Sequence, residues 1–188
     1  MRNGSNPSDR SVWKGLASGM IGGLLGSWMM NLYQTAEVRV SHSWEANNSR
    51  SKSANRRQPA GGEDGRSKNQ DDDATVKMAE LLSGKVLHRK LSRDEKKKAG
   101  PIVHYAYGVL AGGLYGMAAE VVPAVTKGEG TLYATALFIG GDEVAVAALG
   151  LAKSPIDYPL SSHANALASH LVYGVTTELG RRAVRAIL

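Results

Sequence analysis

Cysteine is absent from the 188-residue chain. This absence excludes a disulfide scaffold, a thiolate metal site and a cysteine nucleophile, although it does not fix the compartment. Phenylalanine occurs once, whereas glycine occurs 22 times. The apolar 43% of the chain is therefore small and glycine-rich rather than aromatic. At this length we expect one domain, or one domain with a tail.

Large apolar side chains are missing from residues 46–74, which contain no Val, Ile, Leu, Met, Phe, Trp or Tyr. Such a segment buries too little apolar area to offset the entropy of ordering it, so we expect a disordered linker. Residues 36–100 carry 15 of the 23 basic and 10 of the 17 acidic residues. Because the acids are interleaved with the bases and Trp44 is the only aromatic residue nearby, we expect no nucleic-acid partner.

Four apolar stretches account for most of the remaining chain: residues 12–33, 101–122, 131–152 and 162–180. A helix that crosses the bilayer core needs about 20 mainly apolar residues. The sequence therefore predicts an all-α polytopic membrane protein with about four transmembrane helices and a long polar, partly disordered loop after the first. A soluble bundle is the alternative, because the last three stretches carry ionisable residues in or near their middles. The expected parts are a polar N-terminal tail at 1–11, a first transmembrane helix at 12–35, a disordered loop at 36–73, amphipathic basic juxtamembrane helices at 74–99 and a three-helix membrane domain at 101–188.

The first stretch follows a basic segment, as the hydrophobic core of a signal peptide does. It is long for a signal peptide, and no small-x-small cleavage site follows it, because Gln34 stands two residues before Ala36. We therefore expect an uncleaved membrane helix.

Residues 74–91 predict a moderately amphipathic helix, with Met78, Ala79, Leu82 and Val86 on one face. A basic helix of this kind either lies on anionic lipid or packs on the bundle as an ordinary surface helix. Its candidate lipid-surface residues are Lys85, Arg89, Lys90, Lys96, Lys97 and Lys98.

A new helix is expected to start at Ser92, which forms the pattern of a capping box with Glu95. Gly100 and Pro101 should then break the helix before the second apolar stretch.

The membrane orientation is not settled by the basic residues. They flank both chain ends, which places both ends in the cytoplasm, but the basic segment before the second span then lies on the other side. One stretch is therefore a candidate re-entrant or surface-bound helix. We favour the third, which has Gly140-Gly141-Asp142-Glu143 at its middle.

Glycines recur at intervals of four in the first two stretches. In lipid, this spacing lets helix backbones approach closely and gain van der Waals contact. The partner helix belongs to the same chain or to a second copy, and the sequence leaves both open. The packing candidates are Gly15, Gly19, Gly22, Gly26, Gly108, Gly112 and Gly116.

His104 and Tyr107 recur as His170 and Tyr173, each pair within the pattern H-x-x-Y-G-V. The copies are 66 residues apart, in the second and fourth stretches, which run the same way through a membrane. Side chains three residues apart share a helical face. The pattern is either a weak parallel internal repeat or a chance match.

Ionisable side chains at membrane depth are costly, so they usually face the interior and pair. Three roles are open for them: structural pairs that lock the bundle, a proton or ion pathway, or a haem- or metal-binding site. The last lacks a compact ligand motif, so we expect no metal and no cofactor. The pathway candidates are Asp142, Glu143, His170, Glu178, His104, Tyr107, Tyr173 and Glu120.

No catalytic motif such as G-x-S-x-G or a phosphate-binding loop occurs. Ser161-Ser162-His163 looks like a helix start with a serine N-cap rather than a nucleophile beside a base. The sequence therefore predicts that the protein is not an enzyme.

Residues 169–182, SHLVYGVTTELGRR, resemble the C-terminal signature of the YagU-like inner-membrane protein family, a bacterial domain of unknown function. Residues 98–108, KAGPIVHYAYG, and the first span with Trp28-Met-Met-Asn31 are similar to its relatives too. The resemblance implies a multi-pass helical protein of the bacterial inner membrane with no assigned reaction, and acid tolerance for one branch only. The polar insert at residues 45–73 departs from the family pattern.

We therefore expect an integral inner-membrane protein that is structural or a component of a complex. Its expected partners are the lipid bilayer and a homo-oligomer or membrane complex. The alternatives are a small proton- or ion-handling membrane protein, active in stress or acid tolerance, and a haem- or metal-binding membrane subunit.

Overall fold

The computed structural model describes residues 11–53, 74–88 and 90–188, and within these ranges it contains helices and no strand. The predicted all-α fold is therefore confirmed. The three long helices are α1 (Val12–Ser53), α3 (Arg93–Val121) and α6 (Leu160–Arg185). The shorter helical segments are α2 (Ala74–Leu82), η3 (Ser83–Leu87), η4 (Pro123–Thr126), α4 (Thr131–Leu137), η5 (Phe138–Ala145), α5 (Val146–Ala148) and η6 (Pro155–Asp157).

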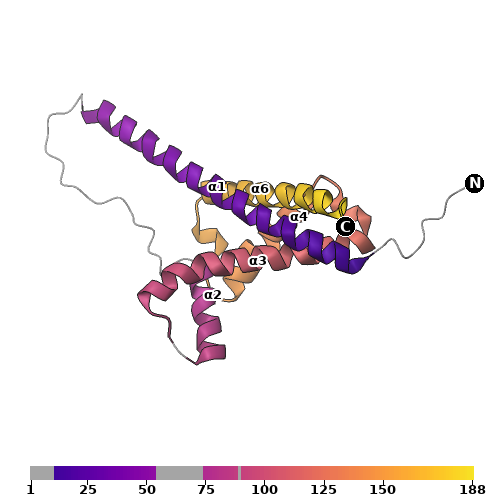
Figure 1. Cartoon of the computed structure of the whole chain (residues 1–188). Helices are drawn as coiled ribbons and strands as arrows, with labels where there is room; N and C mark the ends of the chain where they lie inside the picture. Colours follow the sequence, from indigo (N-terminus) through magenta and orange to yellow (C-terminus); the bar gives the residue numbers. More distant parts are fainter. Residues whose placement is uncertain (1–10, 54–73, 89) are drawn as a thin grey trace, which may run out of the picture.

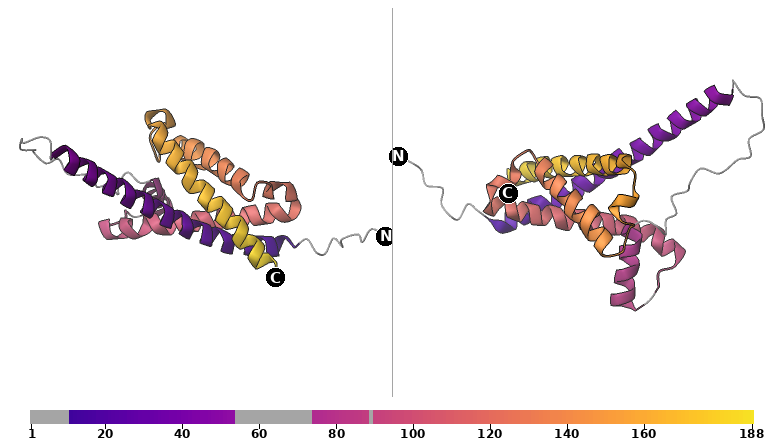
Figure 2. Two further views of the ribbon diagram at one scale, coloured as in Figure 1. Left: turned by 90° about the horizontal axis from the view of Figure 1, so that it is seen from above. Right: turned by 180° about the vertical axis from the view of Figure 1, so that it is seen from behind.

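The centre of the bundle is formed by the long helices, because α1 packs along both α3 and α6 (Figure 1). Helix α1 runs antiparallel to both: Gly15 near its start lies against Gly116 near the end of α3, and Lys14 donates to the carbonyl oxygen of the terminal Leu188 at 2.6 Å. The run α4–η5–α5 returns along α6 (Figure 2). The chain thus passes along the bundle four times. We call the end where α1 begins and α6 finishes the N-terminal end.

Helix α1 is longer than hydropathy suggests. The first transmembrane helix was expected to end at residue 35, whereas α1 continues to Ser53, through the first part of the loop predicted to be disordered. Residues 36–53 contain neither proline nor glycine, so nothing local breaks the helix. The 42 residues span about 63 Å at 1.5 Å per residue. The rest of the predicted loop (54–73), Arg89 and residues 1–10 of the predicted tail lie outside the described residues.

Helix α3 begins with the predicted capping box: the Glu95 amide donates to the Ser92 hydroxyl, and the Ser92 amide donates to the Glu95 carboxylate at 2.8 Å. The expected break at Gly100-Pro101 is wrong, since α3 continues through Pro101 to Val121. Gly100, directly before the proline, is buried and lies against Val76 of α2. The basic segment and the second apolar stretch therefore form one helix.

Helix α2 is packed on the bundle rather than free of it. Its Val76 and Ala79 are buried, and Glu80 forms an ion pair with Lys96 of α3 at 2.7 Å. This arrangement corresponds to the surface-helix alternative for this segment. The exposed lysines of the segment remain candidates for a lipid surface: Lys85, Lys90, Lys97 and Lys98.

The side chains that are completely buried in the bundle are mostly polar, whereas many large apolar side chains are exposed. The apolar and aromatic part of the buried core consists of Met30, Val76, Ala79, Tyr115, Ala119, Ala134, Phe138, Leu151 and Tyr173. The largest fully buried side chains are Glu178, Thr177, Ser18, Ser27 and Ser169. A water-soluble core has the opposite distribution, with large apolar side chains inside and charged ones outside. Large apolar side chains that point outward from the helices include Leu24, Trp28, Leu110, Leu114, Leu132, Ile139 and Val144.

Thr131–Ala148 is long and apolar enough to cross a membrane, and among the described helices it is the one that meets this criterion by length and composition. Its middle, Phe138–Ala145, is a wider π-helix. The helix continues through Gly140 and Gly141, where a re-entrant break was considered, and ends at Ala148. The glycines therefore accompany a widening of the helix, which is a common form of distortion at functional positions.

Candidate functional site

Glycines form the seam between α1 and α3. Gly15, Gly19 and Gly23 of α1 lie against the carbonyl oxygens and Cα atoms of Gly108, Gly112 and Gly116 of α3. A methyl group added to Gly112 would lie 2.5 Å from the carbonyl oxygen of Gly19, which is far inside van der Waals contact. The two backbones are therefore as close as helices can be, and only glycine fits there.

A second seam joins α1 to α6 on a different face. Gly22 lies against the carbonyl group of Thr177, and Gly26 against Tyr173. Gly174 in turn approaches Gly130 and Ala134, which brings α4 onto α6. All seven predicted packing glycines thus make close helix contacts within the chain, which leaves their role between copies untested.

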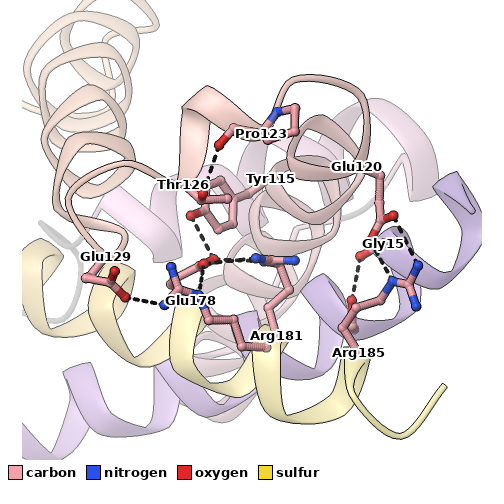
Figure 3. Close-up of polar contacts among 11 residues, drawn as sticks. Gly15, Tyr115, Glu120, Pro123, Thr126, Glu129, Glu178, Arg181 and Arg185 are labelled. Carbon is pink, nitrogen blue, oxygen red and sulfur yellow. Dashed lines mark hydrogen bonds and ion pairs between the residues drawn. The ribbon is translucent and has the colours of Figure 1, made fainter. Parts of the chain in front are cut away.

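A charged cluster lies at the N-terminal end of the bundle and centres on Glu178, whose side chain is fully buried (Figure 3). Arg181 donates from Nε at 2.8 Å and from Nη2 at 2.9 Å, so it binds both carboxylate oxygens. Arg182 donates from Nε at 2.6 Å, and the Tyr115 hydroxyl at 2.8 Å. A buried carboxylate with this many donors is fully compensated, as a buried charge must be.

The cluster extends to the loop between α3 and α4 and to the last turn of α6. Arg182 also pairs with Glu129 at 2.5 Å, a residue held at a positive φ of 54° between two glycines. Arg185 donates to Glu120 at 2.6 Å. The cluster therefore ties the α3–α4 loop and α6 together by permanent charges.

Three tyrosines form a column that leads away from the charged cluster into the bundle. The rings of Tyr115 and Tyr133 are stacked, with centroids 4.2 Å apart. The hydroxyl groups of Tyr133 and Tyr173 lie 3.4 Å apart, and Tyr173 donates to the carbonyl oxygen of Gly108 at 2.6 Å. Tyr107 lies within electrostatic range of Tyr133 and Tyr173. The column thus connects Glu178 with the middle of the bundle.

The column ends near Asp142 in the π-helix. Its Oδ2 lies 3.8 Å from Nε2 of His170, and Asp142 is also in electrostatic range of His104 and Tyr107. His170 donates from Nδ1 to the carbonyl oxygen of Ala166 at 2.9 Å, so its other ring nitrogen faces the carboxylate. His170 is therefore the histidine whose ring nitrogen faces Asp142, and His104 lies in the same region of the bundle.

The two copies of the repeated pattern occupy equivalent places in parallel helices. His104 is 11 residues after the first residue of α3 (104 minus 93), and His170 is 10 residues after that of α6 (170 minus 160). The two histidines lie at similar levels of the bundle, because Gly108 and Tyr173, which follow them by four and three residues, lie against each other.

Glu143 lies apart from Asp142 and contacts the start of α6. His163 places Nδ1 2.7 Å from Glu143 Oε1 and Nε2 3.0 Å from the carbonyl oxygen of Pro155. A carbonyl oxygen only accepts, so Nε2 carries a proton, and a second proton lies between His163 and Glu143. The expected serine N-cap is wrong, since α6 starts at Leu160 with Pro159 at the N-cap and no side-chain cap.

The eight predicted pathway residues thus fall into separate groups rather than one. One group lies at mid-bundle and contains Asp142, His170, His104 and Tyr107, whereas Tyr173 belongs to the column.

Sequence reasoning missed the partners of these residues, which are Tyr115, Tyr133, His163, Arg181 and Arg182. The spacing of Arg181 and Arg182, three and four residues after Glu178, was a usable signal for ion pairing on one helix face; nothing comparable marks Tyr133. Glu178 and Glu120 both lie in the charged cluster, and Glu143 pairs with His163.

Within the described ranges, no group of three or more His, Asp or Glu side chains is arranged to hold a metal ion.

In comparisons with known proteins, the model of a family described as proteins of unknown function, DUF1440, matches residues 75–179. No curated protein and no solved structure matches the chain. The matched segment runs from α2 to the last turns of α6 and includes the tyrosine column, Asp142 and Glu178, whereas α1 lies outside it. Because the match covers more than half of the chain, the protein belongs to the DUF1440 family of proteins of unknown function.

Proposed function

We propose that the protein is a multi-pass protein of the bacterial inner membrane, of the YagU-like kind. Four segments cross the bilayer: the first half of α1, α3 after its basic start, α4–η5–α5, and α6. Its role is structural or that of a complex component, and it has no catalytic centre of its own. The polar pairs inside the bundle hold the helices in register.

The observation that carries this proposal is the inverted distribution of side chains. The five largest fully buried side chains are all polar, and one of them is the carboxylate of Glu178. At the same time Leu110, Leu114 and Leu132 are each more than 60% exposed. In water, exposed leucines would leave apolar surface in contact with solvent, which is unfavourable. In lipid, the same leucines contact acyl chains and the polar side chains pair inside the bundle.

Aromatic residues on α1 support the same placement. Trp13, 76% exposed, and Tyr33 are 20 residues apart on one helix, which corresponds to about 30 Å along the axis. This is about the thickness of the hydrocarbon core, and Trp and Tyr concentrate at its two interfaces. Residues 34–53 of α1 then extend beyond the membrane.

Membrane insertion is tested by placing arginine on an outward-facing position. Leu110→Arg at mid-span should cost about 2.5–3.5 kcal/mol of insertion free energy, and the fraction of protein that resists carbonate extraction should fall accordingly. The matched control is Val40→Arg on the extension of α1, because Leu110 and Val40 are 64% and 66% exposed. Val40→Arg should remain in the membrane like the unaltered protein.

Two results would contradict the proposal. One is release of the unaltered protein by carbonate. The other is equal tolerance of both arginine variants, because exposed substitutions in a soluble protein change stability by only about 0.5 kcal/mol.

A second candidate function is the handling of protons or small ions. The observation that favours it is Asp142, whose half-exposed carboxylate lies 3.8 Å from Nε2 of His170 and within electrostatic range of His104. A carboxylate beside an imidazole at membrane depth is the arrangement that proton relays use. The tyrosine column extends from this point toward Glu178.

Flux through liposomes tests this second candidate. If Asp142 relays protons, Asp142→Asn should reduce proton flux to the level of protein-free liposomes, because a carboxamide does not bind and release protons near neutral pH. Glu143→Gln tests in the same way whether the carboxylate paired with His163 takes part. Glu129→Gln, at an exposed carboxylate outside the bundle, should leave the flux unchanged. Equal flux in both interior variants and the unaltered protein would remove the candidate and leave the structural role.

A further inference from the structure

The face formed by α3 and the π-helix carries two polar side chains that are incompletely satisfied. Tyr107 is 51% exposed, and its hydroxyl makes no hydrogen bond within the described part of the chain. The Asp142 carboxylate is 48% exposed and accepts no hydrogen bond there; the nearest basic side chain is His170, with its Nε2 3.8 Å away. At membrane depth, a half-exposed donor and a half-exposed acceptor are costly unless something covers them.

These two groups lie side by side at the same depth. The Tyr107 hydroxyl is 3.1 Å from the position that a Cβ atom on Gly141 would occupy, and Gly141 directly precedes Asp142. Gly140 has open space around it, with no atom within 4 Å of an added Cβ. In the whole segment Thr131–Ala148, only Ala134 and Phe138 are buried.

We propose that a second copy of this chain covers this face. A donor and an acceptor at equal depth form a self-complementary pattern. When the face meets its own copy across a two-fold axis normal to the membrane, each Tyr107 stands opposite the Asp142 carboxylate of the other copy. Two hydrogen bonds then form, and the open Gly140 allows the π-helices to approach closely. An unrelated partner would have to supply this pattern separately, whereas a second copy carries it already.

The inference rests on the proposed membrane insertion, and one experiment separates the two. Because the chain has no cysteine, a single cysteine reports on one position only. Gly140→Cys in native membranes should give a disulfide-linked dimer on oxidation. The matched control, Leu24→Cys on the outward face of α1, is also exposed, at 47%, but lies on another helix; its dimer yield should be several-fold lower.

The hydrogen bonds are tested by adding Tyr107→Phe to the Gly140→Cys variant. Loss of both bonds should weaken dimerisation about tenfold, at about threefold for each interhelical bond. Asp142→Val should restore dimerisation in the Tyr107→Phe background, because it removes the carboxylate left without a donor. Single-molecule photobleaching of the labelled, cysteine-free protein in lipid should show two steps.

The outcomes are distinguishable. Protein that resists carbonate but shows equal crosslinking at Gly140→Cys and Leu24→Cys, or a single bleaching step, overturns the dimer and leaves the membrane placement intact. Protein that carbonate releases overturns both. Efficient crosslinking at Gly140→Cys that Tyr107→Phe does not weaken also overturns the proposal as stated, because the interface would then not depend on the paired polar groups.

Discussion

Glu178→Gln should destabilise the folded bundle by about 3–5 kcal/mol, the cost of removing one partner from a buried ion pair. The amide of glutamine keeps the size of the side chain but loses its charge. Arg181, which is 8% exposed, would keep its positive charge without the carboxylate that now binds two of its nitrogens. Titration with sodium dodecyl sulfate in mixed micelles, followed by circular dichroism, measures the change in unfolding free energy.

Glu129→Gln is the control in the same cluster. Its carboxylate is 61% exposed and pairs only with Arg182 in the described structure, so its loss should cost less than about 1 kcal/mol. A third variant, Glu178→Leu with Arg181→Met, removes both charges and should recover much of the lost stability. Equal destabilisation by Glu178→Gln and Glu129→Gln would show that Glu178 is not buried as described.

Gly112→Ala should destabilise the bundle by about 3 kcal/mol, at the upper end of the range for overpacking. The added methyl group would lie 2.5 Å from the Gly19 carbonyl oxygen and 2.6 Å from the Gly23 Cα atom. Both are backbone atoms, so no side-chain rotation relieves the clash and α1 has to move away from α3. The same titration measures this loss.

Gly84→Ala provides the matched comparison, because an added Cβ at this helical glycine meets no atom within 4 Å. Here alanine should raise stability by up to about 1 kcal/mol through its higher helix propensity. The two identical substitutions should therefore differ in sign. A neutral Gly112→Ala would mean that the close glycine seam does not exist in the membrane.

Features that depend on neighbouring residues along the chain could be predicted from the sequence. The capping box at Ser92 and Glu95 involves four consecutive residues, and the structure forms it as expected. Glycine spacing likewise indicated which faces of α1 and α3 allow close approach. The end of α1 could not be predicted in this way, because hydropathy describes the surroundings of a helix and not the continuity of its backbone.

Contacts between helices were predictable only in part. The sequence singled out Asp142, His104 and His170 as ionisable groups at membrane depth, but their meeting depends on the relative rotation and depth of three helices. Pro101 led to an incorrect start for the helix, because α3 begins at Arg93 and continues through the proline. Tyr133 carries no pattern at all, because its importance comes from the rings of Tyr115 and Tyr173, which lie on other helices.

The unequal halves of α1 make this helix a mechanical lever. One half is held by glycine seams on two sides, and the other, residues 34–53, is about 30 Å of helix at 1.5 Å per residue beyond them (Figure 1). A tilt of about 5° at the seams displaces the far end by about 3 Å, as the geometry of a rigid rod requires. Small adjustments between α1, α3 and α6 are thus magnified at a point well outside the bundle, and a pull on that point is felt first at the contacts nearest to it, those of Glu37 with Asn165 and of Gly26 with Tyr173.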